Sequence, residues 1–91
     1  MVIKRMVIDV LLPHEPDILT YAEKIGELEG TAGVNVNVLE QDDKTRTVEM
    51  TIEGESLPFE EIKQVIEDLG GSVHSIDQVS AGSRIVEPKP R

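Results

Sequence analysis

The chain has 91 residues, no cysteine, no tryptophan and a net charge of −9 at pH 7. A chain of this length forms one small domain, and the lack of cysteine excludes disulfides, thiolate metal sites and cysteine nucleophiles. Its negative charge repels phosphate backbones, and one Tyr and one Phe leave no stacking platform for RNA, so we expect no nucleic-acid partner.

The first predicted element is a strand over residues 2–12 in which the side chains alternate between two faces. One face holds Lys4, Met6, Ile8, Val10 and Leu12, and the other holds Ile3, Arg5, Val7, Asp9 and Leu11. Two prolines, Pro13 and Pro16, end this strand, and a helix is predicted from Pro16 to Glu29, with Gly30 as its stop. Its expected buried stripe is Ile18, Leu19, Ala22, Ile25 and Leu28.

A hairpin follows, with strands predicted over residues 33–41 and 44–53 and an acidic turn between them. Its expected inward residues are Val34, Val36, Val38, Val48, Met50 and Ile52. A second helix is predicted over residues 58–69, with an apolar stripe of Phe59, Ile62, Val65, Ile66 and Leu69. The last strand covers residues 72–81, and residues 84–91 lose all periodicity, which predicts a flexible tail after a domain of residues 1–83.

The order β-α-β-β-α-β predicts an α+β fold of the ferredoxin-like type. Right-handed crossovers place the strands in the spatial order 4-1-3-2, antiparallel throughout, with both helices on one face of the sheet. The other face of the sheet is then open. This architecture hosts many unrelated functions, so it predicts no reaction.

Three connections meet at one end of this sheet and gather seven polar side chains: Asp9, His14, Glu15, Glu40, Asp42, Asp43 and His74. Carboxylates attract hard divalent cations, and two histidines beside them also suit a transition metal. The predicted ligands of a metal site are Asp9, His14, Glu15, Glu40, Asp42 and His74, with calcium or magnesium expected ahead of zinc. No ligand-spacing motif supports the site, and the alternative is that the turn carboxylates are solvated and the histidines cap or pack.

Asp9 is the central residue of this hypothesis because it interrupts an apolar strand near the middle of the sheet. An unpaired carboxylate there is costly, so it needs an ion, water or a hydrogen bond across a subunit interface. His74 is expected on the neighbouring strand, where it could face Asp9 across the open sheet. These two side chains could also act as base and acid, although the chain shows no activated nucleophile and no phosphate-binding glycine loop.

Four apolar residues are expected on the open face of the sheet, namely Val7, Leu11, Leu39 and Ile76. A monomer rarely leaves such a patch exposed to water, so we expect a homo-oligomer that buries it or that pairs its sheet edges. The alternative is that the C-terminal arm folds back over the sheet. No apolar run approaches the ~18 residues of a membrane span, and no charged leader precedes the first strand, so a cytoplasmic protein without membrane contact is expected.

Three stretches of the chain resemble an archaeal family, domain-of-unknown-function family 211. They are Ile8 to Pro16 (IDVLLPHEP), Gly33 to Val36 (GVNV) and Gly70 to Asp77 (GGSVHSID). The resemblance covers the chain to about Val86. It implies the ferredoxin-like fold, a ring-like or other homo-oligomer, an archaeal cytoplasmic setting and no known reaction.

The leading hypothesis is therefore a non-enzymatic, homo-oligomeric module with a regulatory role that binds a divalent cation or a small ligand at the acidic end of the sheet. One alternative is a small hydrolase or isomerase that uses Asp9 and His74. Another is a purely structural assembly unit without a ligand.

Overall fold

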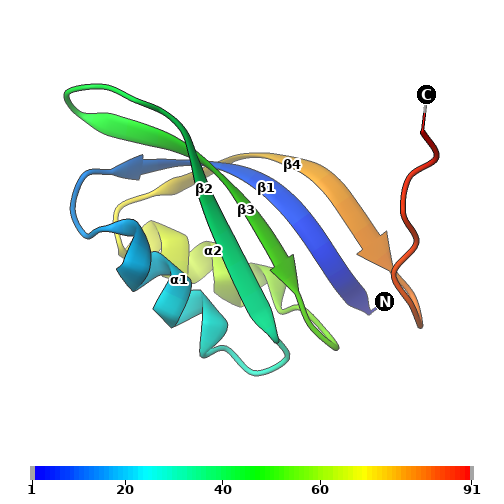
Figure 1. Cartoon of the computed structure of the whole chain (residues 1–91). Helices are drawn as coiled ribbons and strands as arrows, with labels where there is room; N and C mark the ends of the chain where they lie inside the picture. The colour runs from blue at the N-terminus through cyan, green and yellow to red at the C-terminus, as the bar shows by residue number, and fades with distance from the viewer. Residues whose placement is uncertain (1, 91) are drawn as a thin grey trace.

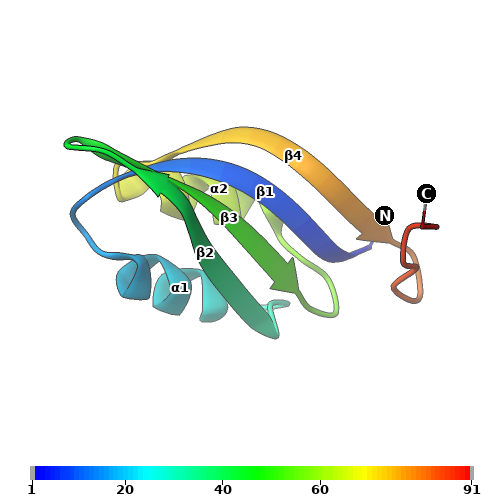
Figure 2. The same ribbon diagram turned by 45° about the horizontal axis from the view of Figure 1, so that its top comes forward.

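The computed structural model describes residues 2–90, so Met1 and Arg91, the outermost residues of the predicted domain and tail, lie outside the described residues. Six elements follow one another: β1 (Ile3–Pro13), α1 (Ile18–Gly26), β2 (Gly33–Gln41), β3 (Thr45–Glu53), α2 (Phe59–Asp68) and β4 (Ser72–Ala81). The four strands form one antiparallel sheet in the order β2-β3-β1-β4. Both helices cover the same face of this sheet (Figures 1 and 2). The predicted ferredoxin-like fold and strand order are confirmed.

The core lies between the helices and the inner face of the two central strands. Alternate residues of β1 and β3 point into it and are inaccessible to solvent, as the alternation predicted. The fully buried set is Met6, Ile8, Val10, Leu12, Tyr21, Ile25, Val48, Met50, Ile52, Ile62 and Ile66. The intervening residues of the central strands therefore face the uncovered side of the sheet.

Helix α1 differs from its prediction in length and in the face that it buries. Asp17 caps it, with its carboxylate oxygen 3.1 Å from the Thr20 amide, and the helix ends at Gly26 instead of Glu29. Two tight turns follow, in which the Leu28 and Thr31 amides donate to carbonyls three residues earlier. Leu19, predicted in the buried stripe, is 69% exposed.

Tyr21 takes the place in the core that the sequence assigned to Leu19. It is fully buried, and its hydroxyl donates a hydrogen bond of 2.8 Å to the Leu69 carbonyl at the end of α2. Ile18, Tyr21, Ile25 and Leu28 form the inward stripe of this segment. A polar tip with a hydrogen-bond partner lets a tyrosine serve as a core residue.

Along the middle of its pairing with β1, strand β4 carries two extra residues. Between the pairs Met6–Val79 and Val10–Val73, β1 advances four positions and β4 advances six. The two residues of β4 left without a partner are His74 and Asp77. Such bulges redirect side chains, and this one determines where His74 lies relative to β1.

The segment after β4 folds back onto the start of β1. The Gly82 amide donates to the Val2 carbonyl at 2.8 Å, and the Val86 amide donates to the Ser80 hydroxyl at 3.0 Å. The Glu87 carboxylate lies 2.8 Å from the Arg5 guanidinium. The predicted tail thus begins with a segment fastened to the domain, and its flexibility stays a prediction. Among residues 2–90, no helix is long and apolar enough to cross a membrane.

Candidate functional site

Two carboxylates face each other on the open side of the sheet. Asp9 of β1 lies directly opposite Glu49 of β3, and on its other side it pairs with Ser75 of β4. Directly opposed residues of an antiparallel pair point to the same face, with their Cβ atoms roughly 5 Å apart. Both side chains are half-buried. Two negative charges are therefore held close together near the centre of the sheet.

The Asp9 carboxylate has one oxygen that the protein leaves unsatisfied. Asp9 Oδ1 is inaccessible to solvent and receives no hydrogen bond from residues 2–90. A buried acceptor without a donor costs about 1–3 kcal/mol, and more for a charged group. Asp9 Oδ1 thus has no partner among the described residues, and the partner expected from the sequence stays a prediction.

Asp9 and His74 line one surface hollow of about 290 Å³, together with Leu11 and Thr47. Three strands contribute to it, because Thr47 of β3 pairs with Leu11 of β1, and His74 is an unpaired bulge residue of β4. The hollow thus combines a carboxylate, an imidazole, a hydroxyl and an apolar wall. Asp9 pairs with Ser75, so His74 reaches the hollow as its diagonal neighbour.

His14 and Asp42 meet at the end of the sheet, but they bind each other and their own turn. His14 Nε2 donates to the Asp42 carbonyl oxygen at 2.6 Å. The Asp42 carboxylate accepts the amides of Thr45 at 2.8 Å and Lys44 at 2.9 Å, and these bonds lower its pKa. Both residues therefore hold the turn.

Arg46 closes the same end of the sheet. Its guanidinium donates to three carbonyl oxygens of the loop before α1, those of Pro13, His14 and Pro16, at 2.9 to 3.2 Å. A positive charge thus stands among the predicted acidic ligands. No sequence pattern predicts this role, because the loop and the arginine are about 30 residues apart.

The two remaining predicted ligands lie apart from Asp9. Glu40 lines a separate hollow of about 140 Å³ with Gln41, Asp42, Thr45 and Thr47, and Glu15 is exposed on its loop. Within residues 2–90, no three His, Asp or Glu side chains lie close enough to hold one metal ion. The described residues of one chain thus do not bring the six predicted ligands together at one place.

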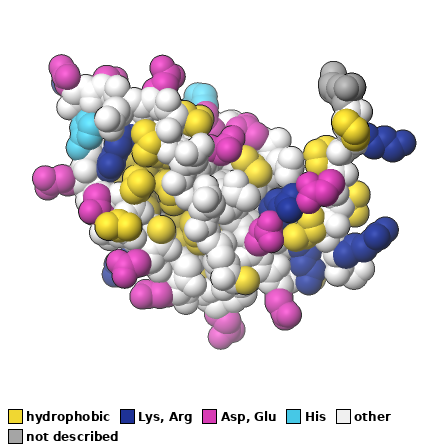
Figure 3. All heavy atoms as spheres, in the orientation of Figure 1, with side chains coloured by type: hydrophobic (Ala, Val, Ile, Leu, Met, Phe, Trp, Pro, Cys, Tyr) yellow, Lys and Arg dark blue, Asp and Glu magenta, His cyan; other side chains and the backbone are white. Residues whose placement is uncertain are grey.

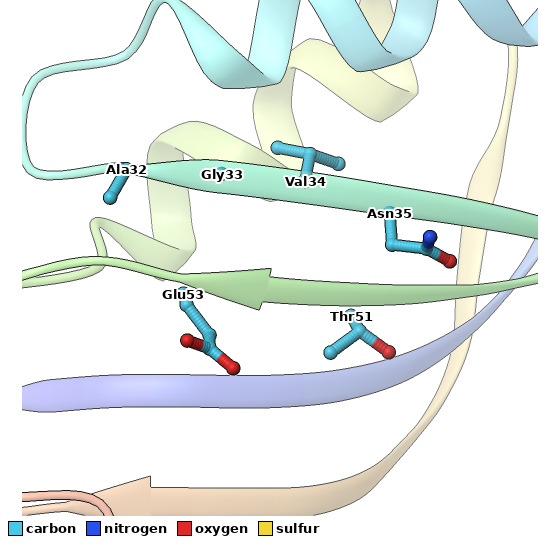
Figure 4. A pocket seen from close by; sticks show the side chains of 6 residues that line it. All are labelled: Ala32, Gly33, Val34, Asn35, Thr51 and Glu53. Carbon is cyan, nitrogen blue, oxygen red and sulfur yellow. The ribbon is translucent and has the colours of Figure 1, made fainter.

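A further hollow of about 380 Å³ lies over β2 and β3, near the start of β2. Figure 4 shows Asn35, Thr51 and Glu53 pointing to the same side, away from the helices. Glu53 is the ionisable group of this hollow, and its carboxylate is 2.9 Å from Arg5 Nε. The one carboxylate of this hollow is therefore already paired with Arg5.

Glu49 is absent from the ligands predicted from the sequence. It alternates with the inward residues Val48 and Met50 and so points to the open face, and only its pairing with Asp9 makes it part of the candidate site. One signal for Glu49 was available in the sequence. In two adjacent strands that both bury their inner residues, the outward residues lie opposite one another on the open face, so an outward Glu49 can face Asp9.

The chain is similar to a protein family over nearly its whole length. Residues 4–91 match DUF211, described as "Uncharacterized ArCR, COG1888". A relative from Methanocaldococcus jannaschii, "Uncharacterized protein MJ0319", is 51% identical over 85 residues, which cover 93% of this chain and 88% of the relative. The chain belongs to the archaeal DUF211 family.

Proposed function

We propose that this protein is a self-assembling module with a regulatory role, which binds a hard divalent cation, calcium or magnesium, on the open face of its sheet. Asp9 and Glu49 would supply the charged oxygen ligands, and Thr47 would add a hydroxyl. His74 would border the bound ion. Of the predicted ligand set, the proposal keeps Asp9 as a ligand and His74 as a neighbour of the ion, and it adds Glu49 and Thr47.

The buried, unsatisfied Oδ1 of Asp9 is the observation that carries this proposal. Without a cation, that oxygen has neither a donor nor solvent, and Glu49 adds a like charge directly opposite. Calcium and magnesium prefer oxygen ligands and neutralise carboxylate pairs, so either ion would remove both penalties together.

A second copy of the chain would complete the site. Calcium takes six to eight oxygen ligands, and magnesium takes six, more than residues 2–90 of one copy bring together here. Leu11 borders the hollow and is 41% exposed. Leu39 is 52% exposed at the irregularity in β2, whereas Ile76, expected on the open face, pairs with the inward-facing Ile8 and so belongs to the helix side of the sheet. Burying such side chains between copies contributes roughly 25 cal/mol for each Å² of apolar area. Assembly and cation binding would therefore support each other.

The test is a thermal melt of the chelator-treated protein, titrated with calcium, magnesium, manganese and zinc, with molar mass recorded by light scattering in the same samples. A bound ion at about 100 times its Kd stabilises a fold by about 2.7 kcal/mol, which raises the Tm of a domain this size by roughly 10 °C or more. We expect a saturable rise for calcium or magnesium in the wild type.

Matched variants locate the site. Asp9→Asn and Glu49→Gln each remove one charge without changing shape, and both should abolish the rise. Glu23→Gln removes one charge from the exposed surface of α1 and should leave it intact. A rise that survives Asp9→Asn would place the ion elsewhere, and the lack of any saturable rise would refute cation binding. Turnover that depends on both Asp9 and His74 would instead favour the acid–base enzyme.

A further inference from the structure

Arg5 lies on the open face of the sheet and holds two carboxylates at once. Its Nε donates to Glu53 Oε2 at 2.9 Å, and its two terminal nitrogens lie 3.0 and 2.8 Å from the two carboxylate oxygens of Glu87. The second contact is the two-pronged mode in which arginine recognises a carboxylate. Figure 3 shows basic and acidic side chains lying against one another beside the C-terminal segment. One positive charge thus serves two negative charges at this place.

The two carboxylates are held in different ways. Glu53 belongs to β3 and is paired directly with Arg5 across the sheet. Glu87 lies beyond the last strand, in a segment fastened by the bond from the Val86 amide to the Ser80 hydroxyl. The side chain of Glu87 is 66% exposed, whereas that of Arg5 is 19% exposed. Glu87 can therefore leave the guanidinium without breaking any pairing between strands, as a ligand supplied by the chain itself would.

The hollow of about 380 Å³ over β2 and β3 borders Glu53 and so lies one strand away from this arginine. Arg5, Glu53 and Gly33 occupy one row across β1, β3 and β2, which spans about 10 Å. A Cβ atom on Gly33 would meet nothing within 4 Å, so the missing side chain leaves the hollow open there. Asn35 and Thr51 border it with an amide and a hydroxyl, which both donate and accept hydrogen bonds (Figure 4). A small molecule in the hollow can thus reach the guanidinium with one end.

The charges beside the hollow select the class of ligand. A molecule that displaces Glu87 must bring its own carboxylate to the terminal nitrogens of Arg5. Glu53 stays in place and the whole chain carries −9, so a ligand with a second negative charge is repelled. The Glu53 carboxylate is 48% exposed and can accept donors besides Arg5, which favours an ammonium group on the ligand. A carboxylate and an ammonium group on one small molecule are the chemistry of a free amino acid.

We propose that Arg5 and Glu53 bind the carboxylate and the ammonium group of a free α-amino acid whose side chain enters the hollow. Glu87 holds the place of the ligand carboxylate until the amino acid displaces it. The C-terminal segment is then an internal competitor, and the apparent affinity is reduced by the fraction of chains in which Arg5 is free. The site is distinct from the proposed cation site, because Arg5 precedes Asp9 by four residues of strand, about 13 Å.

The experiment is isothermal titration calorimetry of the full chain in chelator, with each of the common α-amino acids as the titrant. Chelator keeps cations from the proposed site at Asp9, so the two proposals succeed or fail independently. We expect saturable binding of at least one amino acid. Its methyl ester lacks the carboxylate and its N-acetyl derivative lacks the ammonium group, so neither should bind. Acetate that binds as tightly as the amino acid would overturn the amino-acid class, and no saturable binding by any amino acid would overturn the site.

Two pairs of variants test the two parts of the inference. Glu87→Gln removes the internal competitor, so binding should become about fivefold tighter, whereas Glu23→Gln on the exposed surface of α1 should leave it unchanged. Gly33→Gln places a side chain in the hollow and should abolish binding. Gly26→Gln adds the same side chain in α1, where a Cβ atom also meets nothing within 4 Å, and should leave binding unchanged.

Equal affinities of the wild type and Glu87→Gln would show that Glu87 only fastens the segment, and would overturn the competition. Binding that survives Gly33→Gln would place the amino acid outside the hollow and overturn the site. Circular dichroism of each variant confirms that it is folded, and tighter binding by Glu87→Gln cannot arise from a misfolded chain.

Discussion

Asp9 and Glu49 are paired directly across the two central strands of the sheet, both on its uncovered face. A like-charge pair at this position lowers the stability of the sheet, because central strands cannot move apart to separate the charges. Proteins tolerate local costs of this kind most often at functional sites. The stability of the protein without any bound ion should therefore depend on this pair.

In the presence of chelator, Asp9→Asn should stabilise the fold. The change removes the repulsion and keeps the shape, so we expect the free energy of unfolding to rise by about 0.5 kcal/mol. Urea denaturation of the wild type, Asp9→Asn, Glu49→Gln and the double variant measures the coupling. If the two single effects simply add, the carboxylates do not interact and the pair has no special cost.

Arg46 should be essential for the loop between β1 and α1. Its guanidinium is the donor to three carbonyls of that loop, and bonds from a charged donor contribute about 1.5–3 kcal/mol. Arg46→Met keeps much of the packing and should lower the free energy of unfolding by about 2 kcal/mol. Lys44→Met, in the same turn and exposed, is the control and should stay near the wild type. Similar losses in both variants would contradict the role of the three bonds.

Asp42 should contribute stability that disappears in acid. The Thr45 and Lys44 amides, together with the Thr45 hydroxyl and nearby His14, hold its pKa below the usual 3.8. The folded state therefore binds this proton less readily than the unfolded state does. The stabilisation is full above pH 3.8 and is lost as the pH falls through the lowered pKa.

Asp42→Asn keeps an acceptor for the turn amides but removes the charge, so unfolding free energy should depend less on pH in the acid range. Asp43→Asn, on the neighbouring residue, should leave the acid dependence of the wild type in place. Chemical denaturation at a series of pH values measures all three proteins. If the unfolding free energy of Asp42→Asn falls in acid as much as that of the wild type, the turn does not need the charge of Asp42.

Most of the fold could be predicted because the apolar residues alternate in the strands and recur at helical spacing in the helices along most of the chain. Strands 33–41 and 72–81 match β2 and β4 at both ends, and the buried residues of β1, β3 and α2 are those expected. Helix α1 was one exception, and Val38 of β2, expected to point inward, is another because it is 40% exposed. Leu19 is more apolar than Tyr21, so the sequence pattern assigns Leu19 to the core. The hydrogen bond that lets Tyr21 take this place is made to Leu69, which lies 48 residues away at the end of α2.

The candidate site was predictable only in part. Asp9 stood out because a carboxylate in an apolar strand violates the pattern, and this signal is local. Glu49 depends on strand register, His74 on a bulge in β4, and the capture of His14 by Asp42 on loop packing. Each of these relations joins residues distant in the sequence, so no periodicity reveals it.

Tyr21 offers a direct spectroscopic test, since it is the single tyrosine of the chain. Burial raises the pKa of its hydroxyl above 10, and the positive charge of Arg46 opposes this rise only in part. The neutral form is therefore favoured in the folded state. Its contribution to stability is full below pH 10 and is lost as the pH rises through the raised pKa.

Absorbance titration of the native protein should show the phenolate forming above pH 10, and in denaturant the transition should return to its ordinary position. Tyr21→Phe removes the hydroxyl that donates to the Leu69 carbonyl, so the free energy of unfolding at neutral pH should fall by about 1–2 kcal/mol. The alkaline loss of stability should also shrink in this variant. A native transition at the ordinary pH would show that the tyrosine is solvated and that the bond between the two helices does not hold.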